Sequence, residues 1–360
     1  MKATAQLHEL GQSLWLDSIT REMLDRGTLA RYVDELSVSG LTSNPTIFEK
    51  AIGSGAYDAE IRQKRAQGKS GEELFFELAQ EDLARAATLF RPIHQRTHRV
   101  DGWVSLEVSP RLAHDTGSTL REAKRLHGQA GIPNLFIKIP GTREGLPAIE
   151  EAIFAGVPIN VTLLFSREHY LAAAEAFVRG IERRMDAGLD PHVPSVASIF
   201  VSRWDVAVAK QVPAALRNQL GIAIALRTYA AYRKLLASPR WQRIYNAGGR
   251  PQRLLWASTG TKDPQAEDVL YIRALAAPFT VNTMPESTLK ALAEHQDVGP
   301  LMPADGGDCE AVLARFEASG VDLVGLAARL QDEGAEAFVK SWDDLLAGIA
   351  SKGAAVGKAG

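Results

Sequence analysis

A lysine within an apolar run is the feature of this chain that most clearly indicates chemistry. Lys138 lies in the run 134–141, NLFIKIPG. A short apolar run that ends in Pro-Gly predicts a buried strand followed by a turn. Burial disfavours the charged form of an amine, and a neutral amine is a nucleophile that attacks carbonyl groups. A single lysine near a strand end is more often structural, so the interpretation depends on the residues around it.

Polar side chains recur at comparable positions on the neighbouring apolar runs. Alternate residues of a strand face the same side, and the carboxyl ends of barrel strands converge on one site. A single polar residue in a strand usually just forms hydrogen bonds with the backbone or with water and has no further role. Six successive runs with polar groups in the same register indicate a shared site. These residues are Asp17, Thr42 followed by Asn44, Glu107, Lys138, Asn160 with Thr162, and Ser198 with Phe200.

Two carboxylates near one lysine suit Schiff-base chemistry. The carbinolamine that forms when an amine attacks a ketone must lose water, which needs a proton donor and acceptor close to the nitrogen. Cleavage of a carbon–carbon bond then needs a base for a hydroxyl proton. Glu107, acting through Thr162 and a water, suits the first task, and Asp17 suits the second. The reaction needs no metal and no cofactor.

Short apolar runs alternate with long amphipathic stretches through most of the chain, which is typical of repeated βα units and a parallel sheet. Helical patterns begin at residue 109 and cover 167–187 and 263–274. We predict eight strands, at Ser13–Asp17, Val38–Thr42, Gly102–Val108, Asn134–Ile139, Val157–Leu164, Val193–Phe200, Arg253–Ser258 and Ala277–Val281.

Eight βα units predict an α/β fold, a (β/α)8 TIM barrel with helical insertions and a C-terminal helical extension. We expect one barrel domain over residues 1–350, with insertions at 48–97 and 203–249 and C-terminal helices at 305–350. Residues 351–360 are small and polar, which predicts a disordered tail. A doubly wound Rossmann sheet is the alternative, but the turn after the first strand, Asp17–Arg21, lacks the glycines of a phosphate-binding loop.

The composition excludes several classes of protein. The chain has 360 residues, of which 46% are hydrophobic, and its 41 Lys and Arg nearly balance 43 Asp and Glu. There is no overall field to attract nucleic acid or an anionic membrane surface. No run reaches the length of a membrane span. Cys309 is the only cysteine, so an intrachain disulfide and a cysteine-based metal site are excluded. We expect a cytoplasmic protein that binds neither nucleic acid nor membrane.

Two groups of possible metal ligands are better explained otherwise. His94 and His98 are four residues apart on a predicted helix, but Gln95 stands where a zinc protease has glutamate. The acidic residues beside Cys309 are typical of a solvated loop. We therefore expect no metal site.

Six sequence blocks resemble transaldolase. The resemblance covers about residues 10–300, and the second and fifth blocks together are highly specific. The blocks are LDS at 16–18, LTSNPT at 41–46, VSLEV at 104–108, FIKIP at 136–140, INVTLLFS at 159–166 and ASIFVSR at 197–203.

The resemblance implies a class I aldolase barrel in which Lys138 forms a Schiff base with fructose 6-phosphate or sedoheptulose 7-phosphate. A dihydroxyacetone unit would remain on the lysine and pass to erythrose 4-phosphate or glyceraldehyde 3-phosphate, in the pentose phosphate pathway. The resemblance also implies that Asp17 is the acid and base for the C4 hydroxyl and that Glu107 and Thr162 handle the catalytic water. It further implies that the donor sugar is bound by Thr42, Asn44, Asn160, Ser198 and Phe200.

The phosphate pocket departs from the family pattern. Arg203 matches the family's phosphate-binding arginine, and a guanidinium can bind phosphate through two parallel hydrogen bonds. The family then has Ala-Ser-Phe-Arg after the seventh strand, whereas this chain has ASTGTK at 257–262. We expect Ser258 and the displaced Lys262 to complete the pocket. A solvated Lys262 before a helix is the alternative.

Three functions stay open at this point. The first is the transferase. The second is an aldolase that releases dihydroxyacetone; such relatives tend to have glutamine and tyrosine where this chain has Glu107 and Phe200. The third is a non-catalytic barrel that binds sugar phosphates, which the presence of Lys138 and Asp17 disfavours. The insertion at 203–249 and the C-terminal extension at 305–350 suit either a homodimer interface or a cover for the barrel, and the sequence does not decide between them.

Overall fold

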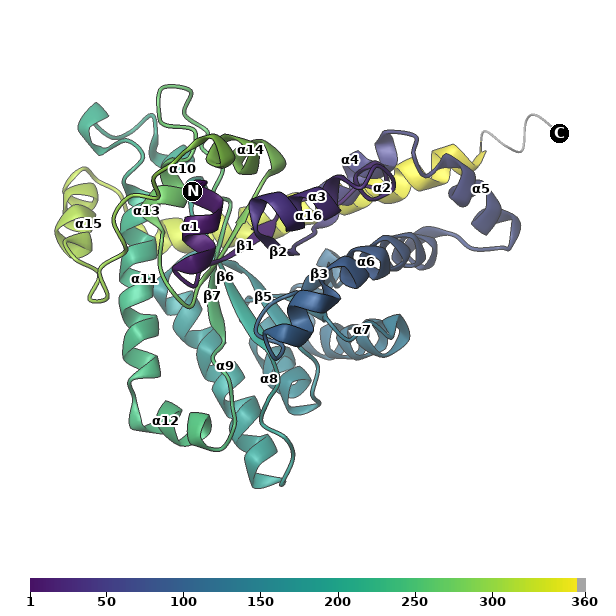
Figure 1. Cartoon of the computed structure of the whole chain (residues 1–360), viewed down its shortest axis with the longest axis horizontal. Helices are drawn as coiled ribbons and strands as arrows, with labels where there is room; N and C mark the ends of the chain where they lie inside the picture. Colours follow the sequence, from purple (N-terminus) through teal and green to yellow (C-terminus); the bar gives the residue numbers. More distant parts are fainter. Residues whose placement is uncertain (355–360) are drawn as a thin grey trace.

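Eight parallel strands form the centre of the molecule, which confirms the (β/α)8 barrel (Figure 1). The computed structural model describes the backbone of residues 1–354. The strands lie in the order β2-β1-β8-β7-β6-β5-β4-β3. Two backbone hydrogen bonds, from Gly102 N–H to Ser39 C=O and from Leu41 N–H to Trp103 C=O, both 2.9 Å long, join the two ends of this order. The strands are β1 (Ser13–Leu16), β2 (Val38–Leu41), β3 (Val104–Glu107), β4 (Leu135–Pro140), β5 (Ile159–Leu164), β6 (Ser195–Phe200), β7 (Arg253–Ala257) and β8 (Val281–Met284).

Helices connect the strands and cover the outside of the barrel (Figure 1). Side-chain caps fix where several of them begin: Asn44 and Ser166 each accept a hydrogen bond from the backbone N–H three residues on. The α-helices are α1 (Ala3–Glu9), α2 (Arg21–Asp25), α3 (Thr28–Leu36), α4 (Pro45–Gly53), α5 (Asp58–Ala66), α6 (Gly71–Arg96), α7 (Thr116–Ala130), α8 (Gly145–Phe154), α9 (Arg167–Asp186), α10 (Ser202–Val208), α11 (Leu220–Leu236), α12 (Pro239–Asn246), α13 (Leu270–Ala274), α14 (Glu286–Glu294), α15 (Cys309–Ala318) and α16 (Leu323–Ala354). Two short 3₁₀ turns, Pro110–Leu112 and Ala214–Leu216, complete the set.

The segments predicted as insertions contain helices of the barrel's own βα units. Helix α6, within 48–97, packs against β2 and β3, and α11, within 203–249, packs against β7. The C-terminal segment 305–350 forms α15 and most of α16. Helix α16 includes residues 351–354, and the remainder of the predicted tail, 355–360, lies outside the described residues.

Two predicted elements were placed wrongly. The eighth strand begins at Val281 rather than ending there, because Pro278 and the left-handed backbone of Phe279 (φ 60°) interrupt the extended conformation. The helix predicted at 263–274 covers only Leu270–Ala274. Asp263, at the start of the predicted helix, instead accepts hydrogen bonds from Asn218 and from the backbone of Gln265 in a turn.

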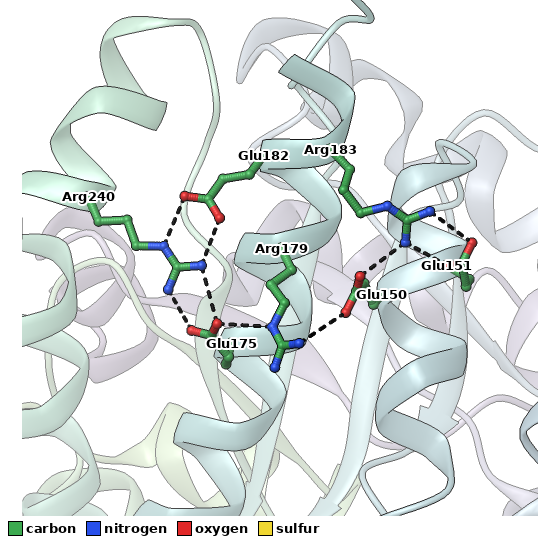
Figure 2. A network of polar contacts seen from close by, with 7 residues as sticks. All are labelled: Glu150, Glu151, Glu175, Arg179, Glu182, Arg183 and Arg240. Atoms are coloured by element: carbon green, nitrogen blue, oxygen red, sulfur yellow. Dashed lines mark hydrogen bonds and ion pairs between the residues drawn. The ribbon is translucent and has the colours of Figure 1, made fainter. Parts of the chain in front are cut away.

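A network of ion pairs ties α8, α9 and α12 together on the outside of the barrel (Figure 2). Arg240 of α12 lies 2.7 Å from Glu175 and 2.7 Å from Glu182, both on α9. Arg183 of α9 lies 3.0 Å from Glu150 on α8. Single exposed ion pairs contribute little to stability, but in a network each guanidinium is held by several carboxylates. The network therefore fixes the position of the short helix α12.

Aromatic rings fill the barrel interior toward the amino ends of the strands. Trp15, Trp103 and Phe136 belong to one buried cluster, and the rings of Trp103 and Phe136 stack with their centroids 4.3 Å apart. Within residues 1–354, no helix combines the length and the apolar character that crossing a membrane would require.

Candidate active site

Lys138 points into the barrel from strand β4. Its Nζ atom lies 2.9 Å from Oε2 of Glu107 on the adjacent strand, and the two side chains are only 6% and 3% exposed. The same Nζ donates a hydrogen bond of 2.8 Å to the carbonyl oxygen of Ser43. The strand register pairs Glu107 with Lys138 and Lys138 with Asn160. The amine is therefore buried, as the sequence predicted, and it also forms an ion pair with Glu107.

The two carboxyl groups of the site are weaker acids than exposed carboxyl groups. Burial raises the pKa of Asp17 above its ordinary value, while attraction to Lys138 and a hydrogen bond from Thr42 offset part of the rise. Burial also raises the pKa of Glu107, against the attraction of Lys138. A carboxylate with a raised pKa is a stronger base. Both groups are thus suited to accept a proton during a reaction.

Asp17 is held in place by a pair of threonines. The hydroxyl of Thr42 donates a hydrogen bond of 2.8 Å to Oδ1 of Asp17, and its oxygen lies 3.1 Å from the Thr283 hydroxyl. Thr283 belongs to β8, and the sequence interpretation missed it because the predicted eighth strand ended at Val281. With the strand placed correctly, Thr283 would have stood at the same end as the other polar groups.

Asn160 and Ser198 are directly linked at the bottom of the site. The Ser198 hydroxyl donates a hydrogen bond of 2.7 Å to the Asn160 side-chain oxygen. The Asn160 amide nitrogen donates to the Ser105 hydroxyl at 3.2 Å. These contacts fix the orientation of the Asn160 amide group, which the sequence could not indicate.

A bulge in β5 positions Thr162. The pairing of β5 with β6 changes register between Val161 and Leu164, and Leu163 has a left-handed backbone with φ 58°. A bulky residue is rarely found in that conformation, and such strain concentrates at functional sites. The buried hydroxyl of Thr162 and Oε1 of Glu107 each lack a hydrogen-bond partner among the described residues.

The residues predicted to bind phosphate lie at one side of the site. Arg203 begins α10 with its guanidinium carbon 5.1 Å from the centre of the Phe200 ring. Ser258 follows β7 with φ 56°, and its hydroxyl lies 2.9 Å from that of Ser202. Lys262 lines the same cavity. Arg203 and Lys262 both lower the pKa of Asp17, although less than Lys138 does.

Helix α16 supplies a wall of the site from a distant part of the sequence. Phe338 lines the cavity, with Lys138 Nζ 5.9 Å from the centre of its ring. Gln331 donates hydrogen bonds to the carbonyl oxygens of Gly141 and Leu163. Gly334 lets the helix pass close to the barrel, since a Cβ there would lie 3.0 Å from Leu163 and 3.2 Å from Arg203. The sequence suggested a helical cap but gave no sign that Phe338 reaches the lysine.

One cavity of about 130 Å³ brings most of the predicted residues together. Glu107 and Asn160 do not line it, but they contact Lys138 and Ser198, which do. The residues that sequence reasoning missed are Thr283, Pro285, Gly260, Leu255, Ala257 and Phe338. The predicted residues that line it are Asp17, Thr42, Asn44, Lys138, Thr162, Ser198, Phe200, Arg203, Ser258 and Lys262.

The arrangement combines a nucleophile, two basic carboxylates and an excess of cations. Lys138, Arg203 and Lys262 outnumber Asp17 and Glu107, which favours a substrate that carries negative charge. In the part of the chain that the structure describes, no cluster of three or more His, Cys, Asp or Glu side chains is placed to hold a metal ion.

The similarity to known proteins extends over nearly the whole chain. A family model described as Transaldolase/Fructose-6-phosphate aldolase matches residues 14–349. The chain is 45% identical to "Transaldolase" of Thermobifida fusca, over 97% of this chain and 98% of that protein. It is 44% identical to "Transaldolase" of Saccharopolyspora erythraea, over 94% of each. It is 39% identical to "Transaldolase 2" of Nostoc punctiforme, over 96% of each.

Proposed function

The chain belongs to the transaldolase/fructose-6-phosphate aldolase family, and on that basis we propose that it catalyses the transaldolase reaction through a Schiff base on Lys138. The enzyme is a transferase (EC 2.2.1.2) of the pentose phosphate pathway. It moves a dihydroxyacetone unit from fructose 6-phosphate or sedoheptulose 7-phosphate to erythrose 4-phosphate or glyceraldehyde 3-phosphate. The contact between Lys138 and Glu107, with Asp17 lining the same cavity, is the observation that carries the proposed mechanism.

The first half of the reaction forms the Schiff base. The Lys138 ammonium gives a proton to Glu107, 2.9 Å away, and the neutral amine attacks the C2 carbonyl of the ketose. The carbinolamine then loses its hydroxyl as water, with protons exchanged through Glu107 and Thr162. Oε1 of Glu107 and the Thr162 hydroxyl are buried oxygens with no partner among residues 1–354, which suits them to hydrogen-bond a water between them.

The second half breaks and remakes a carbon–carbon bond. Asp17 takes the proton of the C4 hydroxyl, the bond between C3 and C4 breaks, and an aldose phosphate leaves. The bonding electrons pass to the iminium, which becomes an enamine on Lys138. An acceptor aldehyde then reverses these steps, its oxygen receives the proton from Asp17, and water releases the new ketose. The iminium on Lys138 makes cleavage of the C3–C4 bond possible, because it accepts the electron pair of that bond.

Specificity for the donor rests on the polar residues around the lysine. We assign the donor hydroxyls to Thr42, Asn44, Asn160 and Ser198, with Phe200 packing beside them. Asn44 has a second task, since its side-chain oxygen caps helix α4 through the Ile47 N–H at 3.0 Å. The phosphate group would lie at Arg203, Ser258 and Lys262. The two cations there match a dianion, and Arg203 is additionally oriented by the Phe200 ring.

Transfer is distinguished from simple release of dihydroxyacetone by its dependence on an acceptor. With fructose 6-phosphate alone, we expect slow release of free dihydroxyacetone. Erythrose 4-phosphate should raise the rate of glyceraldehyde 3-phosphate formation strongly and give sedoheptulose 7-phosphate. A rate that hardly responds to erythrose 4-phosphate, with dihydroxyacetone as the main product, would assign the chain to the aldolase instead. Binding without turnover of either kind would indicate a non-catalytic barrel.

We place this activity in the cytoplasm. The single cysteine, Cys309, is buried and free, which is typical of reducing compartments. The long helices outside the barrel are also compatible with a homodimer. Sedimentation of the full chain at two concentrations distinguishes a monomer from a dimer.

A further inference from the structure

A second and larger cavity opens at the amino ends of the strands. Its volume is about 590 Å³, within the range of about 300–1,000 Å³ that is usual for small-molecule sites. None of the residues assigned to catalysis or to sugar binding lines it. Its walls come from the segments before β3, β6, β7 and β8, the end of α11, and α12.

The second cavity and the active site lie at opposite ends of the same barrel interior. On β4, Phe136 lines the second cavity and Lys138 lines the active site. On β6, Val196 and Ser198 are related in the same way. Residues two apart on a strand face the same side of the sheet, so both point into the barrel, in successive layers along its axis. The stacked rings of Trp103 and Phe136 form the wall between the two ends, so a ligand in the second cavity would not occupy the sugar site.

Positive charge surrounds the mouth of the second cavity. Arg99, Arg233 and Arg250 are exposed, and none of them forms an ion pair within the described part of the chain, unlike Arg240 and Arg253. No aspartate or glutamate side chain of the described residues lines the cavity. Unpaired guanidinium groups around a concave surface attract anions.

Two further basic groups lie deeper in the second cavity. Arg253 is buried, and its guanidinium donates to the Ser13 hydroxyl at 2.7 Å and the Val100 carbonyl at 2.6 Å. His192 is half-buried; burial lowers its pKa, and Arg99 and Arg250 lower it further. Asp190 offsets part of the fall in the His192 pKa, and the Arg253 guanidinium lies 3.9 Å from Asp101.

Aromatic rings are exposed at the same mouth. Phe279 is 65% exposed and Tyr245 is 50% exposed, although large apolar side chains are usually covered. Phe279 also has a left-handed backbone with φ 60°, which costs a residue with a side chain about 1–2 kcal/mol. Its backbone is held on both sides, because its N–H donates to Gly11 and its carbonyl accepts from Tyr232. These two hydrogen bonds keep the Phe279 ring exposed despite the free-energy cost of its left-handed backbone.

The wall formed by α12 is held in place without a ligand. Trp241, Gln242 and Tyr245 of α12 line the cavity. Arg240 on the same helix is bound by Glu175 and Glu182 of α9 (Figure 2). A cavity with a fixed wall loses little conformational entropy when a ligand binds.

We propose that this second cavity binds a small organic anion that carries an aromatic ring. The ring packs against Phe279 and Tyr245, and the anionic group is held by Arg99, Arg233 and Arg250. The apolar walls and the cations are both required, so neither a free inorganic anion nor an uncharged aromatic molecule satisfies the whole site.

Fluorescence titration with 1-anilinonaphthalene-8-sulfonate tests the proposal on the full chain, with N-phenyl-1-naphthylamine as the same ring system without the charge. The charged probe should bind about tenfold more tightly than the neutral one, because charge-assisted hydrogen bonds discriminate by about that factor or more. The double variant Arg233→Gln, Arg250→Gln should reduce this difference severalfold, because only Arg99 of the three exposed arginines remains. Phe279→Gly should weaken both probes, without loss of thermal stability, because glycine tolerates the left-handed backbone.

Lys234→Gln is the matched control, since Lys234 is the exposed neighbour of Arg233 on α11 and does not line the cavity. It should leave both affinities unchanged. Absence of binding, equal affinity for the two probes, or equal effects of Lys234→Gln and of the double variant would overturn the proposal. Displacement of the charged probe by fructose 6-phosphate would also overturn it, because the probe would then occupy the sugar site.

Discussion

Nζ of Lys138 lies 2.9 Å from Oε2 of Glu107, on adjacent strands inside the barrel. Burial raises the pKa of Glu107, so this carboxylate is a stronger base than an exposed one. In the mechanism that we propose, Glu107 takes a proton from the Lys138 amine by a single short transfer.

Glu107→Gln should slow Schiff-base formation and shift the products toward free dihydroxyacetone. The amide has nearly the same shape as the carboxyl group but cannot accept the Lys138 proton. Loss of a general acid–base group lowers the rate by about 10²- to 10⁴-fold. The ratio of sedoheptulose 7-phosphate to dihydroxyacetone, measured with erythrose 4-phosphate present, checks the shift. Glu310→Gln, on the exposed surface, serves as the control. An unchanged ratio would mean that Glu107 does not separate transfer from release.

Thr42→Val should move the acid side of the kcat profile to higher pH. Thr42 donates to Asp17 and so lowers the pKa of this carboxyl group. Without that hydrogen bond the pKa rises further, and Asp17 is protonated, and inactive as a base, at a higher pH. A hydrogen bond of this kind is worth about 1.5 kcal/mol, which corresponds to about one pH unit. Thr283→Val, which leaves the contact between Thr42 and Asp17 in place, should shift the profile less. Equal shifts in the two variants would contradict a specific role for Thr42.

Lys262→Met should raise KM for fructose 6-phosphate by about tenfold or more, since a hydrogen bond to a charged group is worth about 1.5–3 kcal/mol. The KM for unphosphorylated fructose should change little, because Lys262 would contact only the phosphate. Lys210→Met is the control: Lys210 lies with Lys262 along a neighbouring pocket but does not line the active site. A similar rise for both sugars would show that Lys262 acts on the fold of the loop rather than on the phosphate.

Asp205→Asn should change how stability depends on pH. Burial raises the pKa of Asp205 to about 6, against hydrogen bonds from Tyr271 and from the backbone of Gly221 and Leu220. The folded state therefore holds this proton more tightly than the unfolded state. Stability from this group is complete below about pH 4 and is lost as the pH rises to about 6, by about 3 kcal/mol in total.

Urea unfolding at pH 4.5 and pH 6.5 measures the effect. The wild type should lose more free energy of unfolding between these values than Asp205→Asn does. Other carboxyl groups contribute equally to both proteins and cancel in the comparison. The same pH dependence in both proteins would rule out a raised pKa for Asp205.

The parts of the fold and of the site that follow from the two-residue periodicity of strands could be predicted from the sequence. Lys138, Glu107, Asn160 and Ser198 share a face of adjacent strands, and that relationship can be read from spacing alone. The expectation of a closed barrel then implied which strands are neighbours. The eighth strand was displaced because the mostly apolar run Ala277–Val281 resembles a strand despite Pro278, and Thr283 was missed as a result.

Other features of the site depend on tertiary contacts that no local pattern encodes. Phe338 reaches Lys138 from a helix 200 residues later in the chain. The bulge at Leu163 becomes visible only through its φ of 58° and the register change beside it. The ion pair between Lys138 and Glu107 could not be predicted from the sequence either, because it depends on the distance of 2.9 Å between side chains on two strands.

Borohydride reduction in the presence of fructose 6-phosphate tests the central claim most directly. The reagent reduces an iminium to a stable amine, so it should inactivate the enzyme and leave a three-carbon adduct on Lys138, located by peptide mass spectrometry. Lys138→Ala should carry no adduct. An adduct on another lysine, or inactivation that does not depend on the sugar, would contradict a Schiff base at Lys138.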